Sequence, residues 1–185
     1  MAADDADDAG LVRAMAAGDL ASLAALYRRH SQVLLTQLVL LTGDQMLAEE
    51  LLQDTMLAAW RSAGSFRGGS KVRTWLIAIA RRKARDKQRR QRFTVVDDAD
   101  IEKSVAPDLG PEQLVISRAE ARAVADVITD LPLAQREVIG LVFGAGLTMA
   151  EAADVLEVPL NTVKSRLHTA RATLTQMLAK KGYVR

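Results

Sequence analysis

The sequence contains no cysteine and only two histidines among its 185 residues. The missing cysteines exclude a disulfide-stabilised scaffold, a thiolate metal site and a cysteine nucleophile, and they fit a reducing compartment. A single histidine on a basic helix, here His168, is typical of a hydrogen-bonding or solvated residue when the chain offers no cysteine and only His30 besides. We therefore expect neither a metal nor a cofactor.

Aromatic residues are scarce, at 4% against 49% hydrophobic residues, so we expect two small cores rather than one large one. No apolar run is long enough to predict a membrane span. The N-terminus, MAADDADDAG, is acidic where an export signal is basic and then apolar, which predicts a cytoplasmic protein. Residues 1–10 have no periodic apolar positions and predict a disordered acidic tail.

The period of a strand is also missing, whereas apolar residues recur at helical spacing, so the fold is expected to be all-α. One long helix is expected from Leu20 to Leu41, broken or bent near His30 and Ser31. A second follows Asp44, with Met46 and the next apolar residues facing inward. Its outward face is acidic and is either solvated or a surface for a partner; it consists of Glu49, Glu50, Gln53 and Asp54.

A cationic helix follows a loop rich in Gly and Ser. The loop, residues 62–70, carries Phe66, and such an aromatic either packs back onto a core or accepts an unpaired base. Residues 71–92 contain ten Lys or Arg against one Asp. This charge repels itself unless a polyanion lies along the helix, which favours nucleic-acid phosphate over a merely solvated helix.

The charge reverses after this helix, because residues 93–112 contain six Asp or Glu against one Lys. This acidic segment predicts a flexible linker that lies in a basic channel of another protein, folds back over the basic helix, or is solvated. The expected division is a tail at 1–10, a helical domain at 11–92, the linker at 93–112 and a second helical domain at 113–185.

The second domain contains a helix-turn-helix pattern at residues 147–178. Thr148 with Glu151 three residues later predicts a capping box at the start of the first helix. Pro159 ends that helix, and Asn161 or Thr162 is expected to cap the next one. In the second helix an apolar stripe recurs at helical spacing, formed by Val163, Leu167, Ala170, Leu174 and Met177.

The face opposite this stripe carries short polar side chains between cations, which suits a major groove, where small donors and acceptors meet base edges and Lys or Arg meet phosphates. The alternative is a solvated amphipathic helix. From Asn161 to Arg185 there are six Lys or Arg and no Asp or Glu. The expected DNA contacts are Asn161, Thr162, Lys164, Ser165, Arg166, His168, Thr169 and Arg171.

The order of these parts resembles the extracytoplasmic-function (ECF) group of RNA polymerase sigma factors, group 4 of the sigma-70 family. The resemblance is carried, in order, by LTGDQMLAEELLQDTMLAAW, KVRTWLIAIARRKARDKQRR, LPLAQREVI and NTVKSRLHTARATL. It implies a region 2-like domain at 11–92 and a region 4-like helix-turn-helix domain at 113–185. It also implies binding to core RNA polymerase and promoter-specific initiation.

The resemblance further implies a role for each surface. Glu49, Glu50, Gln53 and Asp54 would meet the polymerase β′ clamp helices, and the second domain would meet the β flap. Residues 161–171 would read the −35 element of promoter DNA. A separate anti-sigma factor is expected. Contacts with the −10 element and its backbone would come from Phe66, Arg67, Lys71, Arg73, Trp75, Arg81, Arg82, Lys83 and Arg85.

Two other functions compete with this one. The hypothesis of a stand-alone helix-turn-helix regulator explains the second domain, but it leaves the basic helix and the acidic face without a function. An enzyme is not expected, because the sequence offers no phosphate loop, metal cluster or nucleophile–base pair.

Overall fold

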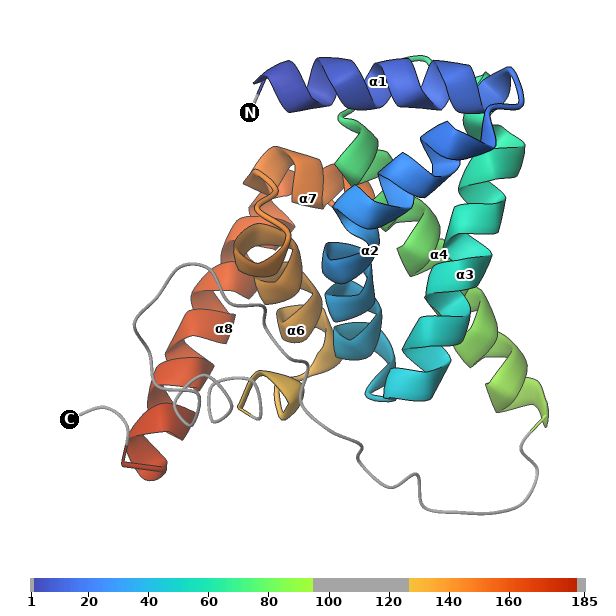
Figure 1. Ribbon diagram of the computed structural model, residues 1–185. Helices are drawn as coiled ribbons and strands as arrows, with labels where there is room; N and C mark the ends of the chain where they lie inside the picture. The colour runs from blue at the N-terminus through green and yellow to red at the C-terminus, as the bar shows by residue number, and fades with distance from the viewer. Residues whose placement is uncertain (1, 95–126, 183–185) are drawn as a thin grey trace.

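The computed structural model describes residues 2–94 and 127–182. Within these ranges every regular element is a helix, which confirms the expected all-α fold (Figure 1). The N-terminal half holds α1 (Ala2–Ala16), α2 (Leu20–Thr42), α3 (Gln45–Ser62), the 3-10 turn η1 (Ala63–Ser65) and α4 (Val72–Thr94). The C-terminal half holds α6 (Leu133–Ile139), the π-helical turn η2 (Gly140–Gly144), α7 (Met149–Leu156) and α8 (Leu160–Lys180). The expected linker falls outside the described residues from position 95 onward.

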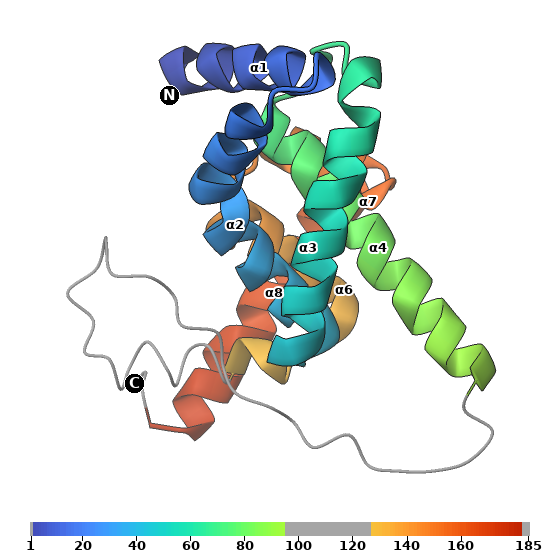
Figure 2. The same ribbon diagram turned by 45° about the vertical axis from the view of Figure 1, so that its right-hand side comes forward.

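The ends of α2 and α3 follow the local signals in the sequence. Asp19 caps α2 by accepting the backbone N–H groups of Ala21 and Ser22. Gly43 ends α2 in the left-handed region, at φ 72°, and Asp44 caps α3. The break considered near His30 and Ser31 is wrong, because α2 is one continuous helix from Leu20 to Thr42, but the helix does change direction along its length (Figures 1 and 2). His30 is 3% exposed.

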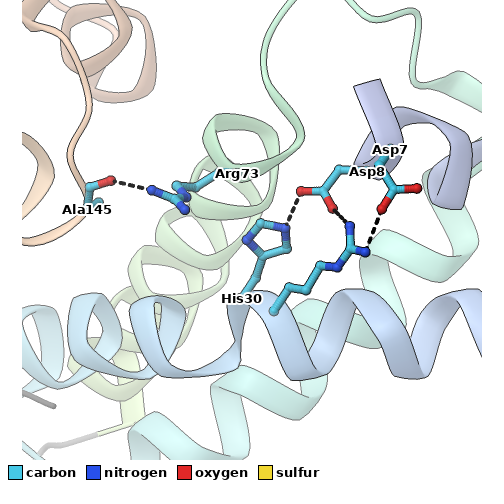
Figure 3. Close-up of polar contacts among 6 residues, drawn as sticks. Asp7, Asp8, His30, Arg73 and Ala145 are labelled. Carbon is cyan, nitrogen blue, oxygen red and sulfur yellow. Dashed lines mark hydrogen bonds and ion pairs between the residues drawn. The ribbon is translucent and has the colours of Figure 1, made fainter. Parts of the chain in front are cut away.

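Helix α1 corrects the prediction of a disordered acidic tail, because residues 2–10 are helical. Asp8 is 4% exposed and its carboxylate lies 2.7 Å from both His30 Nε2 and Arg29 Nη1, while Arg29 also bonds Asp7 (Figure 3). Val12 and Met15 are buried in the core. Asp7 and Asp8 are thus held by side chains of α2, and α1 lies across the ends of the other N-terminal helices (Figure 1).

The two halves share one continuous core rather than two separate ones. The buried apolar cluster runs from Val12 and Leu38 in the N-terminal half to Leu141, Leu156 and Ala170 in the C-terminal half. Helices α6 and α7 contact α2 and α4 respectively, and the views in Figures 1 and 2 agree on this arrangement. The last turns of α4 project beyond the other helices (Figure 2).

The helix-turn-helix consists of α7 and α8. Thr148 and Glu151 form the expected capping box. Glu157 adopts the left-handed conformation at φ 57° and lets the chain turn toward α8. The expected cap at Asn161 or Thr162 is wrong: α8 begins at Leu160, and Pro159 occupies the cap position without a side-chain hydrogen bond. The fixed φ of proline prepares a helical start without such a bond.

The turn η2 adds one residue to a helical turn between α6 and α7. The N–H of Ala145 donates to the carbonyl of Gly140 at 2.8 Å, five residues earlier. The side chain of Gln37 on α2 donates to the same carbonyl at 2.9 Å. The widened turn leaves Phe143 55% exposed while Leu141 is buried.

We predict that Thr148→Ala lowers the free energy of unfolding by about 1 kcal/mol, because the N–H of Glu151 loses its cap, and that Thr148→Ser changes it little. Burial opposes ionisation of Glu151, but hydrogen bonds from Thr148 and Lys71 outweigh it and lower the pKa of Glu151. The stabilisation from the ionised carboxylate is therefore present above the unfolded pKa and is lost as pH falls through the folded one. Urea unfolding at neutral and acidic pH tests both statements, and an unchanged midpoint for Thr148→Ala would contradict them.

Candidate nucleic-acid and protein interfaces

Helix α8 buries one face and exposes the other, as its sequence predicts. Val163, Leu167 and Ala170 are buried against α6 and α7. Thr162 and Arg166 are half-buried at the flanks of the opposite face. The exposed residues of that face are Asn161, Lys164, Ser165, His168, Thr169 and Arg171. The structure thus places six of the eight predicted −35 contacts on the exposed side of a single helix, with Thr162 and Arg166 at its half-buried margins.

The hydroxyls on this face are oriented by the helix itself. Ser165 donates to the carbonyl of Thr162, and Thr169 donates to that of Ser165, both at 3.0 Å. Each oxygen therefore keeps lone pairs directed outward, suited to a base amino donor. The Arg171 guanidinium carbon lies 5.2 Å from the centre of the Phe143 ring, a cation–π contact that the sequence analysis did not foresee.

Helix α4 packs its first half on the core. Val72, Leu76, Ile77, Ala80 and Ala84 are all buried. Ahead of it, Phe66 packs on Trp75 with ring centroids 4.9 Å apart and an interplanar angle of 44°. Of the two alternatives for Phe66, the geometry is that of an aromatic held against the core, while Arg67 beside it is exposed.

One edge of α4 faces the C-terminal half. Lys71, the residue before α4, lies 3.2 Å from Glu151. Arg73 donates to the carbonyl of Ala145 at 3.4 Å (Figure 3). Arg81 pairs with Glu137 at 2.8 Å and donates to the carbonyl of Val155 at 3.3 Å. Three of the seven cations predicted to contact the −10 region therefore contact the C-terminal half in this conformation.

The other edge of α4 keeps its cations at the surface. Arg82 is exposed and Lys83 is half-buried there. Arg85 is also exposed, but it lies one turn after Arg81 and lines a cleft with Glu137 and Arg166. Further along, Lys87 pairs with Glu50 on α3 at 2.9 Å. The structure thus divides the predicted basic surface into an edge that contacts the C-terminal half and an edge that faces solvent.

The acidic face of α3 is exposed at all four predicted positions, Glu49, Glu50, Gln53 and Asp54. Met46, expected to face inward, is 82% exposed, and Leu57 is 52% exposed. Met46, Glu50, Gln53 and Leu57 are spaced by four, three and four residues, so they share one helix face. The same spacing was available in the sequence, and it describes an acidic face with an apolar residue at each end.

Within residues 2–94 and 127–182, no group of three or more His, Asp or Glu side chains is arranged to hold a metal ion. Across the same residues, none of the helices has both the length and the apolar character that crossing a bilayer demands.

Comparison with known proteins identifies both halves. The family Sigma-70 region 2 matches residues 26–94, and Sigma-70 region 4 matches residues 121–174. The ECF RNA polymerase sigma factor SigL of Mycobacterium tuberculosis is 33% identical over 176 residues, covering 94% of this chain and 98% of SigL.

Two solved structures share the fold at 27% sequence identity. One is CnrH in complex with the cytosolic domain of CnrY, with a TM-score of 0.69 and coverage of 94% of this chain and 97% of the other. The second is the sigma factor RpoE with the anti-sigma factor NepR from Bartonella quintana, with a TM-score of 0.68 and coverage of 79% and 89%. The matched regions, the length of the alignments and the helix-turn-helix geometry agree, and the chain belongs to the ECF group of the sigma-70 family of RNA polymerase sigma factors.

Proposed function

We propose that this sigma factor reads its promoter through two separate surfaces and holds the polymerase with a third. As a sigma factor the chain binds core RNA polymerase and directs it to promoters, and it is not an enzyme. Our proposal concerns which residues bind the polymerase and which recognise the promoter. The observation that supports it best is the outward face of α8, where polar side chains lie between Lys164 and Arg171 on a helix held by a helix-turn-helix.

Recognition of the −35 element is assigned to α8. Ser165, His168 and Thr169 lie centrally on its exposed face and would meet base edges, whereas Lys164, Arg166 and Arg171 would meet phosphates. Asn161 and Thr162 lie in its first turn, where the recognition helix of such a motif approaches the bases.

Contact with the −10 element is assigned to residues 66–85. Exposed Arg82 and Arg85 would grip the backbone, and Arg67 lies on the loop that precedes α4. Opening the duplex without ATP requires a captured base, because unstacking costs a few kcal/mol. The half-buried Phe66–Trp75 pair is the proposed stacking surface for such a base.

Polymerase binding is assigned to the acidic face of α3, with Met46 and Leu57 as apolar ends. The β′ clamp helices are the proposed partner of this face, and the β flap is the proposed partner of the C-terminal domain. In protein interfaces, buried apolar residues usually supply contact area, while charged residues around them supply specificity and speed up association. Because core RNA polymerase acts in the cytoplasm, the chain is proposed to act there too.

A separate anti-sigma factor is proposed as the regulator. Two relatives of the same fold were solved with such partners, CnrY on CnrH and NepR on RpoE. A protein that copurifies with the chain from its host and blocks its transcription in a reconstituted system would establish this partner.

We predict that the purified chain and core polymerase together produce transcripts with defined start sites, and that neither does so alone. Sequencing the transcript ends measures this and supplies the promoter motif. Asp54→Lys is expected to weaken binding to the isolated β′ clamp helices about tenfold, while Asp154→Lys, an equal charge change at an exposed position of α7, is not. Random start sites would contradict the proposal.

We predict that Ser165→Ala and His168→Ala change which −35 bases are preferred, by roughly 1–3 kcal/mol of discrimination where a base contact is lost. Lys164→Gln is expected to weaken binding to all sequences alike and to reduce the salt slope by about one. Thr175→Ala removes an exposed hydroxyl of the same helix outside residues 161–171 and serves as the control. Transcription from a library of randomised −35 elements measures the preferences; an unchanged base preference in both variants would remove α8 from this role.

We predict that Arg82→Gln together with Arg85→Gln slows promoter opening with little change in base preference, because both side chains are assigned to phosphates. Arg28→Gln removes one exposed cation from α2 and is the control. Permanganate footprinting of the opened strand measures the effect, and normal opening in the double variant contradicts the assignment.

A further inference from the structure

Phe143 is an exposed aromatic side chain in the turn η2, which precedes the helix-turn-helix. It is 55% exposed, although the neighbouring Leu141 and Ala145 are buried. Two backbone hydrogen bonds fix this turn from within the C-terminal half. The N–H of Ala145 donates to the carbonyl of Gly140 at 2.8 Å, and that of Leu147 donates to the carbonyl of Leu141 at 3.0 Å. An ordered backbone therefore holds a large apolar group at the surface.

The ring of Phe143 contacts one cation of the candidate DNA-reading face. The guanidinium carbon of Arg171 lies over the ring, 5.2 Å from its centroid, which is within the range of a cation–π interaction. Among residues 2–94 and 127–182, the guanidinium makes no hydrogen bond or ion pair, so the ring is its one partner there. Arg171 is exposed, and a long exposed side chain otherwise samples many rotamers.

The ring holds the charge of Arg171 without using its hydrogen-bond donors. An aromatic face attracts a cation through its quadrupole, so the five N–H groups of the guanidinium stay available for acceptors. A carboxylate partner would instead compete with phosphate for these donors, as Glu137 does at Arg81, at 2.8 Å. The contact with Phe143 is therefore compatible with simultaneous binding of a phosphate by Arg171.

The place of Arg171 on α8 makes its orientation important for recognition. Lys164 and Arg171 are seven residues apart, so they lie on the same side of the helix and about 10 Å apart along its axis. Ser165 and His168, which the proposed function assigns to base edges, lie between them in the sequence. Phosphate contacts fix the register of a reading helix on the duplex. A mobile Arg171 would leave one end of this register undefined.

We infer that Phe143 is a positioning residue for promoter binding, and that its ring holds the Arg171 guanidinium in place for a backbone phosphate of the −35 element. This inference rests on the proposed assignment of Arg171 to a phosphate. Phe143 lies outside α8 and acts through Arg171, whose side chain then loses less conformational entropy when the chain binds DNA.

Substitutions at Phe143 separate the effect of the aromatic face from that of apolar bulk. Phe143→Leu keeps an apolar side chain but removes the ring, whereas Phe143→Trp keeps an aromatic face that attracts cations at least as well. The matched control is Tyr27→Leu, which removes a 44% exposed ring from α2, outside the proposed DNA and polymerase surfaces. Each change is also made together with Arg171→Gln. Circular dichroism confirms that each variant keeps its helices.

Holoenzyme reconstituted from core polymerase and each full-length chain is titrated with promoter DNA at several salt concentrations. Phe143→Leu is expected to weaken binding about threefold for all −35 sequences alike, as for the loss of an exposed cation–π contact. Its salt slope stays that of the wild type, because the charge of Arg171 remains. Phe143→Trp and Tyr27→Leu are expected to bind as the wild type does. Combined with Arg171→Gln, Phe143→Leu is expected to have no further effect, since the cation that it positions is gone.

Two results would overturn the inference. One is wild-type binding by Phe143→Leu. The other is equal weakening with and without Arg171→Gln, which would mean that the ring acts by packing or by contact with polymerase. An Arg171→Gln holoenzyme with unchanged affinity and salt slope instead removes the phosphate contact from the proposed function, and the positioning role falls with it. The ring-current shift of the Arg171 side-chain NMR signals in the free chain, lost in Phe143→Leu, then still reports whether the two groups are in contact.

Discussion

Helix α4 lies in two different environments along its length, the apolar core in its first half and the solvent-exposed surface in its second half. Its first half is fixed in the core by Val72, Leu76 and Ile77, while the second half carries cations that no apolar core accepts. Alanines at positions 80 and 84 are the last buried residues of this helix with described side chains, and their size lets it approach its neighbours closely. Residues 85–90, which follow these alanines, include no apolar side chain, so this part of the helix has nothing to bury in a core. The change from packed to surface turns places the cations proposed to bind phosphate outside the core.

Signals that act over one helical turn were predictable from the sequence. The caps at Asp19 and Asp44, the left-handed Gly43 and the capping box of Thr148 and Glu151 all depend on residues within four positions of each other. The outward face of α8 was equally predictable, because helical period alone separates it from the buried stripe. The sequence alone was therefore enough to locate the candidate DNA-reading face of α8 and its flanks.

Contacts between distant residues were not predictable in this way. Asp8 finds His30 across 22 positions, and Gln37 finds Gly140 across 103, so composition suggested a solvated tail and two independent domains instead. A buried carboxylate with cationic partners is stable, but only the fold supplies those partners. Met46 is a different case, because its spacing from Glu50, Gln53 and Leu57 already puts it on the exposed face of α3, so its position was predictable from helical period.

The widened turn at Gly140–Gly144 also sets the orientation of α7 and α8, the two helices of the helix-turn-helix, relative to α6. A π-turn holds one residue more than an α-turn, and each residue rotates a helix by about 100°. Shortening the segment by a single residue would thus swing everything after it through more than a quarter of a circle relative to α6. The candidate reading surface would then face a different direction, although its own side chains were unchanged. Its orientation relative to α6 therefore depends on the number of residues in this turn and not on the side chains proposed to contact the bases.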